Sequence, residues 1–548
     1  MIMGDVRRKN GSVICAAVLG AILYICIYGV HVLNPMEVDW LISGGDRAQH
    51  YLGWVGYRNS KWFFPIGLMD QLSYPYKTSI IFTDSIPLMA VLFKILSPIL
   101  PHRFQYFGLW GLLCFFMNGA FSAKILQKYI KVSFQVVLGS VFFILSFQMI
   151  QRMFMHTALG GHWLILWAIY LLVYRDQKSY KHKLLSWMAL GAVCSAVHLY
   201  LLLMCGILLM GTVLVEVLEQ KRDSVINRLL NVGGYLVAFI GSALIVVALL
   251  GGFSGGISAT TGGLGAYSLN LNGFINSQTH GRLLRTFSQL DTQYEGFSYL
   301  GVGILFLLLC TLIELVLHVK REGVKYSPVV LGGSVAFVIS FILAVSPTVS
   351  MGNRIIKHFI LPTVVWDIWS VFRASGRISW VCIYLIFVFA LCADYRVVNS
   401  RRKSIIIVIA LMLQMLDISG YVMEKHQLWS NKICYQSNLD QEAWDTLIQE
   451  VKTDHIVIMD DFNMSKHYDL AVWAMENKIT INKFYFARSM DNELIAEQKE
   501  SDVNTVFVWE KENFVPDASS TMHYQEVDEM FVVGYTQSAQ DTPDWNEE

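Results

Sequence analysis

The chain has 548 residues, of which 54% are hydrophobic and only 15% are charged, whereas soluble domains carry about 25% charged residues. This composition excludes an ordinary soluble enzyme and indicates a polytopic membrane protein. The net charge of zero conceals two parts of opposite sign, because residues 421–548 hold 25 acidic and only 9 basic side chains. The basic charge of the remainder follows from membrane topology, and no nucleic-acid signature accompanies it.

A helix needs about 20 mostly apolar residues to cross a bilayer. Eleven segments are expected to do so: 12–33, 104–126, 132–150, 157–174, 184–198, 199–218, 231–252, 299–318, 327–347, 376–394 and 404–420. The segments that would then face the cytoplasm are all short and basic, as the positive-inside rule requires. We therefore expect a cytoplasmic N-terminus, with the loop after the first span and the C-terminal residues on the outer face.

The apolar segment 82–100 is ambiguous, because it contains Pro87 and Pro98 near its ends and Lys94 in its middle. If it crossed the membrane, every later basic segment would move to the outside. We therefore expect it to form an amphipathic helix that lies in the headgroup region.

The C-terminal residues alternate between apolar bursts and amphipathic stretches, which is typical of a small α/β domain with some parallel pairing. The expected strands are 455–460, 478–486, 505–510 and 530–535, and the expected helices are 440–452 and 465–478. The chain thus divides into a membrane domain over 1–420, with a first outer loop at 34–103 that carries interfacial helices, and an extracytoplasmic α/β domain over 421–548. The last dozen residues are acidic and are expected to be disordered.

The stretch "GGDRAQHYLGW" places charged residues in an aromatic segment directly after the first span. Four residues in and after this stretch are spaced three or four apart, as on one face of a helix: Asp46, His50, Gly53 and Tyr57. A surface helix would then hold Asp46 near an outer cavity, with Arg47 and His50 as candidate substrate-binding residues. The alternative is an interfacial belt in which the aromatic rings anchor the loop and Asp46 only pairs with Arg47 or Arg58.

Four further polar residues face the outside in this topology: Asp84, His156, His162 and Glu295. Asp84 is a second candidate catalytic carboxylate, although it could equally cap the interfacial helix. The two histidines are six residues apart, which is not a helical ligand spacing and does not favour zinc. We expect them to line an outer cavity as hydrogen-bond donors, and Glu295 to face the same cavity.

The segment "WDIWSVFRASGRISW" places Arg373 and Arg377 just before the tenth span. Two guanidiniums on one side of a helix N-terminus form an anion site, because forked donors and the helix dipole act together. Arginines that snorkel to the membrane edge are the alternative. Since arginine on the outer face runs against the positive-inside bias, we expect a phosphate group to bind here.

Several motifs together resemble the GT-C superfamily of integral-membrane glycosyltransferases, and in particular a bacterial family of GT-C-like membrane proteins. They are "GGDRAQHYLGWVGYRNSKWFFPIG", "TDSIPL", "FQYFGLW", "LNLNGFIN", "QYEGFSYLG" and "FRASGR". The resemblance implies transfer of a sugar from a polyprenyl-phosphate donor to an envelope glycan, lipid or protein acceptor outside the bacterial cytoplasmic membrane. It also implies that Asp46, which matches the carboxylate of the first loop, is the catalytic base. The chain lacks the adjacent acidic pair of the protein mannosyltransferases; if Mg²⁺ or Mn²⁺ is required, Asp46 and Asp84 would hold it.

Glycosyl transfer needs a carboxylate that takes the acceptor's proton and cations that stabilise the departing phosphate. We therefore expect Asp46, Arg373 and Arg377 to meet over one outward-opening cavity. Two other functions stay open. A transporter or flippase of lipid-linked sugars would show ionisable residues near mid-bilayer and an inverted repeat, and neither is evident. An envelope glycan polymerase or acyltransferase would also use arginine and histidine on the outer face.

Overall fold

The computed structural model describes residues 2–177, 179–219, 224–254, 262–322, 327–395, 398–486, 504–516 and 522–536. The chain forms two compact units. The first unit comprises residues 1–37, 103–246 and 260–432, and the second comprises residues 38–102, 247–259 and 433–548. The acidic end that we expect to be disordered, 537–548, lies outside the described residues.

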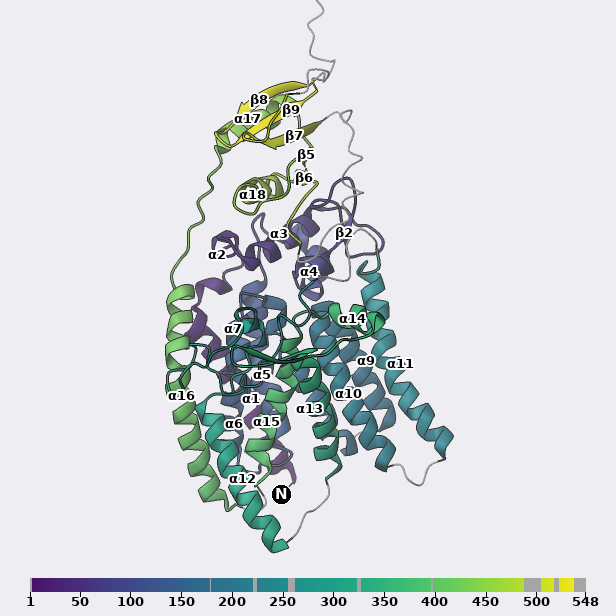
Figure 1. Cartoon of the computed structure of the whole chain (residues 1–548), viewed down its shortest axis with the longest axis vertical. Helices are drawn as coiled ribbons and strands as arrows, with labels where there is room; N and C mark the ends of the chain where they lie inside the picture. Colours follow the sequence, from purple (N-terminus) through teal and green to yellow (C-terminus); the bar gives the residue numbers. More distant parts are fainter. Residues whose placement is uncertain are drawn as a thin grey trace, which may run out of the picture. The chain divides into compact units, whose positions relative to one another are not determined.

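Long helices dominate the first unit, where most of them run roughly side by side (Figure 1). They are α1 (Ile2–Tyr28), α5 (Phe107–Leu126), α6 (Ser133–Ile144), α7 (Phe147–Arg152), α8 (Trp163–Val173), α9 (Tyr180–Val197), α10 (Leu199–Glu219), α11 (Val225–Leu249), α12 (Val302–Glu322), α13 (Pro328–Val345), α14 (Thr363–Ser370), α15 (Trp380–Cys392) and α16 (Ser400–Ser430). By length and composition, seven helical segments among the described residues could cross a membrane: 10–28, 107–126, 199–219, 225–249, 328–345, 375–392 and 400–430. The chain is therefore a membrane-embedded protein.

The other four expected spans also contain helices, but these are shorter or more polar. The apolar helices at 133–144, 157–173 and 302–318 have fewer than 18 residues, and α9 begins with the polar sequence "YKHK". The total of eleven spans thus stays a prediction.

The ambiguous segment 82–100 forms only one short α-helix, α4 (Pro87–Ile95), between two 3-10 turns. Nine residues extend about 14 Å, roughly half of the hydrocarbon thickness. The helix is therefore too short to cross. Leu88, Leu92, Ile95 and Ile99 are exposed at helical spacing, which suits a helix that lies on an apolar surface.

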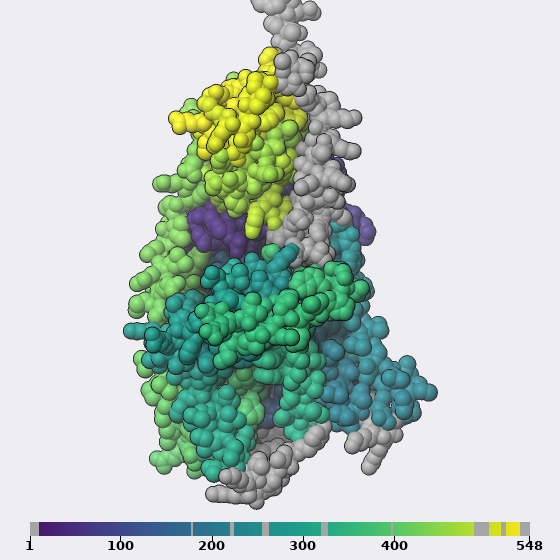
Figure 2. All heavy atoms as spheres, in the orientation of Figure 1, coloured from purple at the N-terminus to yellow at the C-terminus, as the bar shows by residue number. Residues whose placement is uncertain are grey.

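A second exposed apolar surface belongs to the first unit, where strands β3 (Thr348–Met351) and β4 (Arg354–His358) pair as an antiparallel hairpin before α14. Figure 2 shows this green segment on the visible face of the first unit. Its most exposed apolar side chains are Met351, Ile355, Ile356, Ile360, Val364 and Ile368. Such a patch on a membrane protein is typical of contact with lipid.

The second unit combines the first loop with the C-terminal α/β fold. The loop contributes α2 (Asp39–Ile42), α3 (Asp46–Asn59), α4 and the short pair β1 (Leu68–Met69) and β2 (Thr78–Ser79). The C-terminal residues contribute α17 (Gln441–Val451), β5 (His455–Ile458), α18 (Tyr468–Glu476), β6 (Thr480–Ile481), β7 (Thr505–Glu510), β8 (His523–Val527) and β9 (Phe531–Tyr535).

These five C-terminal strands form one sheet in the order β6-β5-β7-β9-β8. β5 pairs in parallel with both β6 and β7, whereas β9 pairs antiparallel with β7 and β8. The predicted parallel pairing and the four predicted strands are therefore confirmed. The edge strand β8 was not predicted, because its sequence "HYQEV" is polar and mostly exposed.

Within the second unit the first loop is joined to the C-terminal fold by backbone hydrogen bonds. The Ile481 N–H donates to the Gln71 carbonyl at 2.8 Å, and the Tyr74 N–H donates to the Ile481 carbonyl at 3.0 Å. The Tyr74 ring stacks on His455 with centroids 3.8 Å apart, and α3 packs against α18. The loop and the C-terminal residues thus belong to one body, a grouping that the expected boundary at residue 421 does not anticipate.

Candidate functional site

The most concentrated charge in the first unit surrounds the Glu295 carboxylate, which lies in a 3-10 turn over Asp291–Gly296. Its Oε2 accepts a hydrogen bond from Arg377 Nε at 2.8 Å and lies 2.9 Å from Arg152 Nη2. Its Oε1 lies 3.8 Å from His156 Nε2. Three residues predicted for the site, His156, Glu295 and Arg377, are thus brought together.

A close contact between two glycines explains how these distant segments meet. Gly296 follows Glu295, and Gly376 precedes Arg377. A Cβ atom on Gly376 would lie 2.5 Å from the Gly296 Cα, a separation that no side chain tolerates. The two backbones therefore approach because Gly376 has no side chain, and the approach sets Glu295 beside Arg377.

The network is buried and carries an excess of positive charge. The side chains of Arg152 and Glu295 are 1% and 9% exposed. Burial alone would raise the pKa of Glu295, but Arg377 and Arg152 more than offset this and hold the pKa well below its usual range. One ionised carboxylate is therefore shared by two guanidiniums, which suits a place where a further anion binds.

Arg373 and Arg377 both precede α15, and neither lies in an α-helix. Residues Ser375–Ser379 form a 3-10 turn, and α15 begins only at Trp380. The Arg377 guanidinium is held by Glu295 and lies 5.2 Å from the Tyr200 ring, whereas the half-buried Arg373 lies 5.8 Å from the Tyr267 ring. Arg373 is thus the more accessible of the two guanidiniums.

The second unit holds the other candidate carboxylates. Helix α3 begins at Asp46, as predicted, after Gly45 in a backbone conformation with φ 71°. His50 lies one turn further along the same face of the helix. Its Nε2 is 3.5 Å from Asp84 Oδ2, and the two side chains are 1% and 23% exposed. The structure thus pairs an imidazole with the second predicted carboxylate.

Asp84 reaches His50 through a strained backbone. Asp84 and Ile86 both adopt left-handed conformations, with φ of 57° and 53°, which cost about 1–2 kcal/mol for each residue. The Ser85 hydroxyl between them donates to the His50 carbonyl at 2.6 Å. Gly53 permits this approach, because a Cβ atom there would lie 2.4 Å from Thr83.

Asp84 therefore does not cap the interfacial helix. The N-cap of α4 is Ile86, which offers no side-chain hydrogen bond, and Pro87 begins the helix. The strain instead fixes the direction of the Asp84 carboxylate, as is common at functional sites.

The remaining predicted residues have other partners. Arg47 Nη2 donates to the Ser43 hydroxyl at 2.9 Å, and burial lowers the pKa of Arg47. His162 is fully buried, where its Nδ1 lies 2.6 Å from the Tyr384 hydroxyl and its ring packs on Trp380. His162 thus packs inside the first unit, and among the described residues no hydrogen bond or ion pair joins it to the Glu295 network.

Arg152 and Tyr200 belong to the site but were not predicted. Arg152 lies in the expected outer turn "QRMFMH", where the signal that singled out Arg373, a basic residue against the positive-inside bias, also applies. Tyr200 carries no comparable signal, since its hydroxyl accepts a hydrogen bond from the Ala374 N–H, a contact that only the fold creates.

His50 and Asp84 are the residues of the second unit that could hold a divalent cation. A neutral imidazole nitrogen and a carboxylate oxygen suit Mn²⁺ better than Mg²⁺, which prefers oxygen ligands and retains several waters. Asp46 lies on the same helix face as His50, but its carboxylate is not among the ligand atoms that lie within 4.8 Å of one another there. Such an ion would supply Lewis-acid stabilisation of charge on a phosphate.

Comparison with known protein families matches two adjoining regions of the chain. No curated protein matches it. Residues 443–535 match the C-terminal domain that accompanies the family DUF6311. Residues 17–419, which include both the Glu295 network and the His50–Asp84 pair, match the main domain of that family, so the chain belongs to the family described as domain of unknown function DUF6311.

Proposed function

We propose that this protein is a glycosyltransferase of the GT-C type, which moves a sugar from a polyprenyl-phosphate donor to an envelope acceptor. The observation that carries the proposal is the His50–Asp84 pair, a carboxylate and an imidazole 3.5 Å apart in the loop that follows the first apolar helix. Acid–base groups with fixed orientation are what transfer to a hydroxyl acceptor requires.

In this proposal Asp46 is the general base that takes the proton of the acceptor hydroxyl. His50 assists from the same helix face as Asp46, and its pairing with Asp84, which follows the 3-10 turn Ile80–Thr83, keeps the Asp84 carboxylate oriented. The acceptor oxygen forms a bond to the anomeric carbon as the bond from that carbon to the donor phosphate breaks. The phosphate leaves with the electron pair of the broken bond.

The departing phosphate gains negative charge, which guanidinium groups stabilise. Arg373 is half-buried and is the guanidinium we assign to direct contact with the donor phosphate. Arg377 and Arg152 are tied to Glu295, and their excess charge raises the local positive potential. Arg377 thus contributes mainly through the field it creates.

We also propose that the protein resides in the bacterial cytoplasmic membrane, with its N-terminus in the cytoplasm and the second unit outside. A single cysteine introduced near residue 79, at the exposed position 77, or at the exposed position 440, in a background without reactive native cysteines, should react with an impermeant maleimide in intact cells. Labelling of either position only after the inner face is exposed contradicts this orientation.

The test of the reaction uses the full chain in lipid nanodiscs with radiolabelled polyprenyl-phosphate sugars. Replacing the base by Asp46→Asn should slow sugar release from the lipid by about 10²–10⁴-fold. Arg373→Ala should weaken use of the donor, and Glu442→Gln, an exposed carboxylate of α17, serves as the matched control.

Three results would redirect the proposal. Full transfer by a folded Asp46→Asn protein excludes Asp46 as the base, and loss of transfer in Asp84→Asn alone assigns that role to Asp84. Movement of intact lipid-linked sugar between the leaflets without cleavage instead indicates a flippase.

A further inference from the structure

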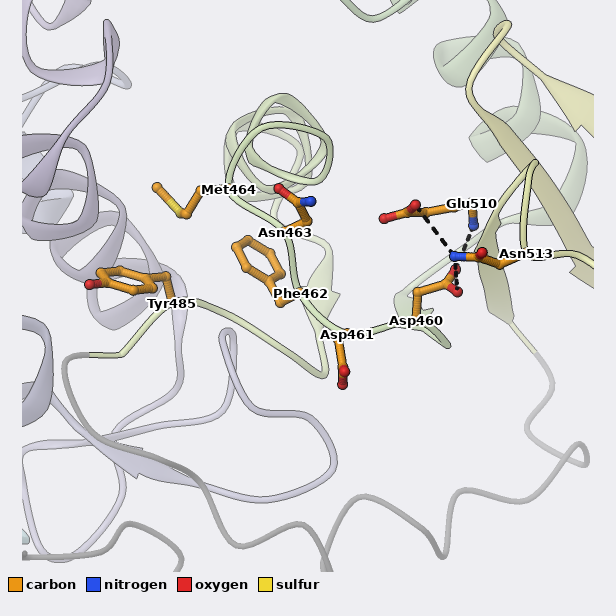
Figure 3. Close-up of a pocket in the computed structure, with 8 residues that line it drawn as sticks. All are labelled: Asp460, Asp461, Phe462, Asn463, Met464, Tyr485, Glu510 and Asn513. Carbon is orange, nitrogen blue, oxygen red and sulfur yellow. Dashed lines mark hydrogen bonds between the residues drawn. The ribbon is translucent and has the colours of Figure 1, made fainter. Parts of the chain in front are cut away.

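An open hollow of about 620 Å³ lies in the C-terminal fold of the second unit (Figure 3). Its lining comes from the ends of three neighbouring strands and the chain that follows them: residues 460–464 after β5, Tyr485 after β6, and Glu510 and Asn513 at and after the end of β7. Because these strands are parallel, their carboxyl ends meet at one edge of the sheet. In open α/β sheets this edge is where ligands bind.

The three segments are tied together beneath the hollow. The Asp460 carboxylate accepts hydrogen bonds from the Glu510 N–H at 2.5 Å and from Asn513 Nδ2 at 3.0 Å. Lys483 Nζ donates to the Asp460 carbonyl at 2.7 Å. Residues after all three strands are thus held in fixed positions, so a ligand would meet a preformed surface.

Other polar groups of the lining keep hydrogen-bond donors or acceptors that a ligand could use. Asn463 Oδ1 accepts from the Ser465 N–H and hydroxyl, which orients the amide, while its Nδ2 has no partner within the described ranges. Asp461 is exposed, and its carboxylate accepts no hydrogen bond from any residue that the structure describes. A donor and an acceptor therefore remain for a ligand.

The lining has an apolar side and a polar side. Figure 3 shows Phe462, Met464 and Tyr485 gathered at one side, and Asp460, Glu510 and Asn513 at the other. The Tyr485 side chain is 43% exposed although it is a large aromatic group. A pyranose ring has the matching character, because its C–H faces stack on aromatic rings and its hydroxyls pair with carboxylates and amides.

Charged ligands fit this lining less well. A metal cation would need several carboxylate oxygens, but Asp461 alone of the lining carboxylates is uncommitted among the described residues, since Asp460 is occupied by internal donors and Glu510 Oε2 accepts from Lys466. Phosphates would need free cations, but Lys466 bridges Glu510 and Glu512, and Lys483 is bound to backbone carbonyls. The lining thus favours a hydroxyl-rich ligand without net charge.

We infer that this hollow binds a carbohydrate, with a pyranose ring stacked on Tyr485 and its hydroxyls paired with Asp461 and Asn463. Its assignment to the acceptor glycan rests on the proposed glycosyl transfer, whereas sugar binding itself does not. The C-terminal fold would then capture the acceptor and raise its concentration near the transfer reaction.

Saturation-transfer NMR on the full chain in nanodiscs, without any donor lipid, tests this inference. The probes are the methyl pyranosides of glucose, galactose, mannose and N-acetylglucosamine. At least one should bind, and Tyr485→Ala and Asp461→Ala should each weaken that binding by about tenfold. Tyr485→Phe should retain most of it, because stacking is preserved. His523→Ala, on the far edge strand β8, is the matched control.

Three outcomes overturn the inference: no probe binds the wild-type protein, binding is the same in the Tyr485 and Asp461 variants, or a lysine-rich peptide binds where no sugar does. Thermal unfolding of each variant checks that it is folded. If Asp46→Asn retains full transfer while sugar binding follows Tyr485, the proposed catalytic role fails and the carbohydrate site stands.

Discussion

Glu295 in the first unit and Glu510 in the second have similar immediate surroundings. Each carboxylate is 9% exposed, pairs with a cationic side chain and lies within 4 Å of a histidine nitrogen. Their cations differ, because the Arg152 and Arg377 side chains are 1% and 10% exposed, whereas Lys466 is 33% exposed. The loss of stability when either carboxylate is removed thus depends on whether its cation can become hydrated.

Removing one member of a buried ion pair leaves an uncompensated charge, which costs about 3–5 kcal/mol. Partly exposed pairs are worth about 0–1 kcal/mol, since water replaces the lost partner. The first network is therefore expected to be indispensable to folding and the second to be nearly neutral.

The largest effect is expected for Glu295→Ala, which leaves two buried guanidiniums without the carboxylate that they share. It should destabilise the first unit by about 3–5 kcal/mol and lower the midpoint of thermal unfolding followed by tryptophan fluorescence. Glu424→Gln, which removes a carboxylate that is 62% exposed in α16, is the matched control. An unchanged midpoint in Glu295→Ala would mean that the arginines find other partners.

Acid should weaken the first unit through His280. Burial, with a smaller contribution from Lys425, lowers the pKa of His280 to about 4, whereas the unfolded value is 6.5. As the pH falls below 6.5 the unfolded chain binds a proton that the folded one does not. Stability should therefore drop by up to about 1.4 kcal/mol per pH unit until pH 4 is reached.

The measurement for His280 is the unfolding midpoint between pH 7 and pH 5. In a His280→Gln protein the midpoint should fall less over this range than in the wild type. Equal slopes for the two proteins would show that other groups account for the acid sensitivity.

The backbone conformation of Lys452 gives a prediction for the stability of the second unit. Lys452 ends α17 in a left-handed conformation with φ 52°, and its side chain is exposed. Lys452→Gly should stabilise the C-terminal fold by about 1 kcal/mol, because glycine adopts this conformation without strain. Hydrogen exchange of β5 and β7 should slow accordingly, and faster exchange in the variant would contradict the assignment.

The smallest effect is expected for Lys466→Met. It should leave the stability of the C-terminal fold nearly unchanged, and any difference should shrink at high salt. Hydrogen exchange of β7 at low and high salt measures both quantities. A loss as large as that of Glu295→Ala would mean that exposure of the cation does not govern these networks.

Local patterns in the sequence predict much of this fold. The helix from Asp46, the parallel strands and the short, Pro-bounded segment at 82–100 all follow from periodicity and turn residues. The polar edge strand β8 lacks such a pattern. The turn between Arg373 and α15 was not predicted, because the four-residue spacing of Arg373 and Arg377 also suits an α-helix, whereas Ser375–Ser379 form a 3-10 turn.

The candidate site is harder to predict than the fold. Arg152, Glu295 and Arg377 lie far apart in the sequence, and their meeting depends on packing between segments that carry no shared motif. Asp84 was predicted as a carboxylate of interest, but its left-handed backbone and its pairing with His50 depend on the close approach of Gly53.

One hydrogen bond restricts how many times the chain can cross a bilayer. The Ser79 hydroxyl donates to the Leu250 carbonyl at 2.6 Å, so the ends of these two segments share one side, and the Gln71–Ile481 ladder adds the C-terminal fold to that side. An even number of crossings must then separate residue 102 from 247, and again residue 259 from 433. If all seven long apolar helices of the described residues cross, three of them fall in each interval. This parity would then require α12 to cross as well, together with one or all three of α6, α8 and α9, which gives nine or eleven crossings in total.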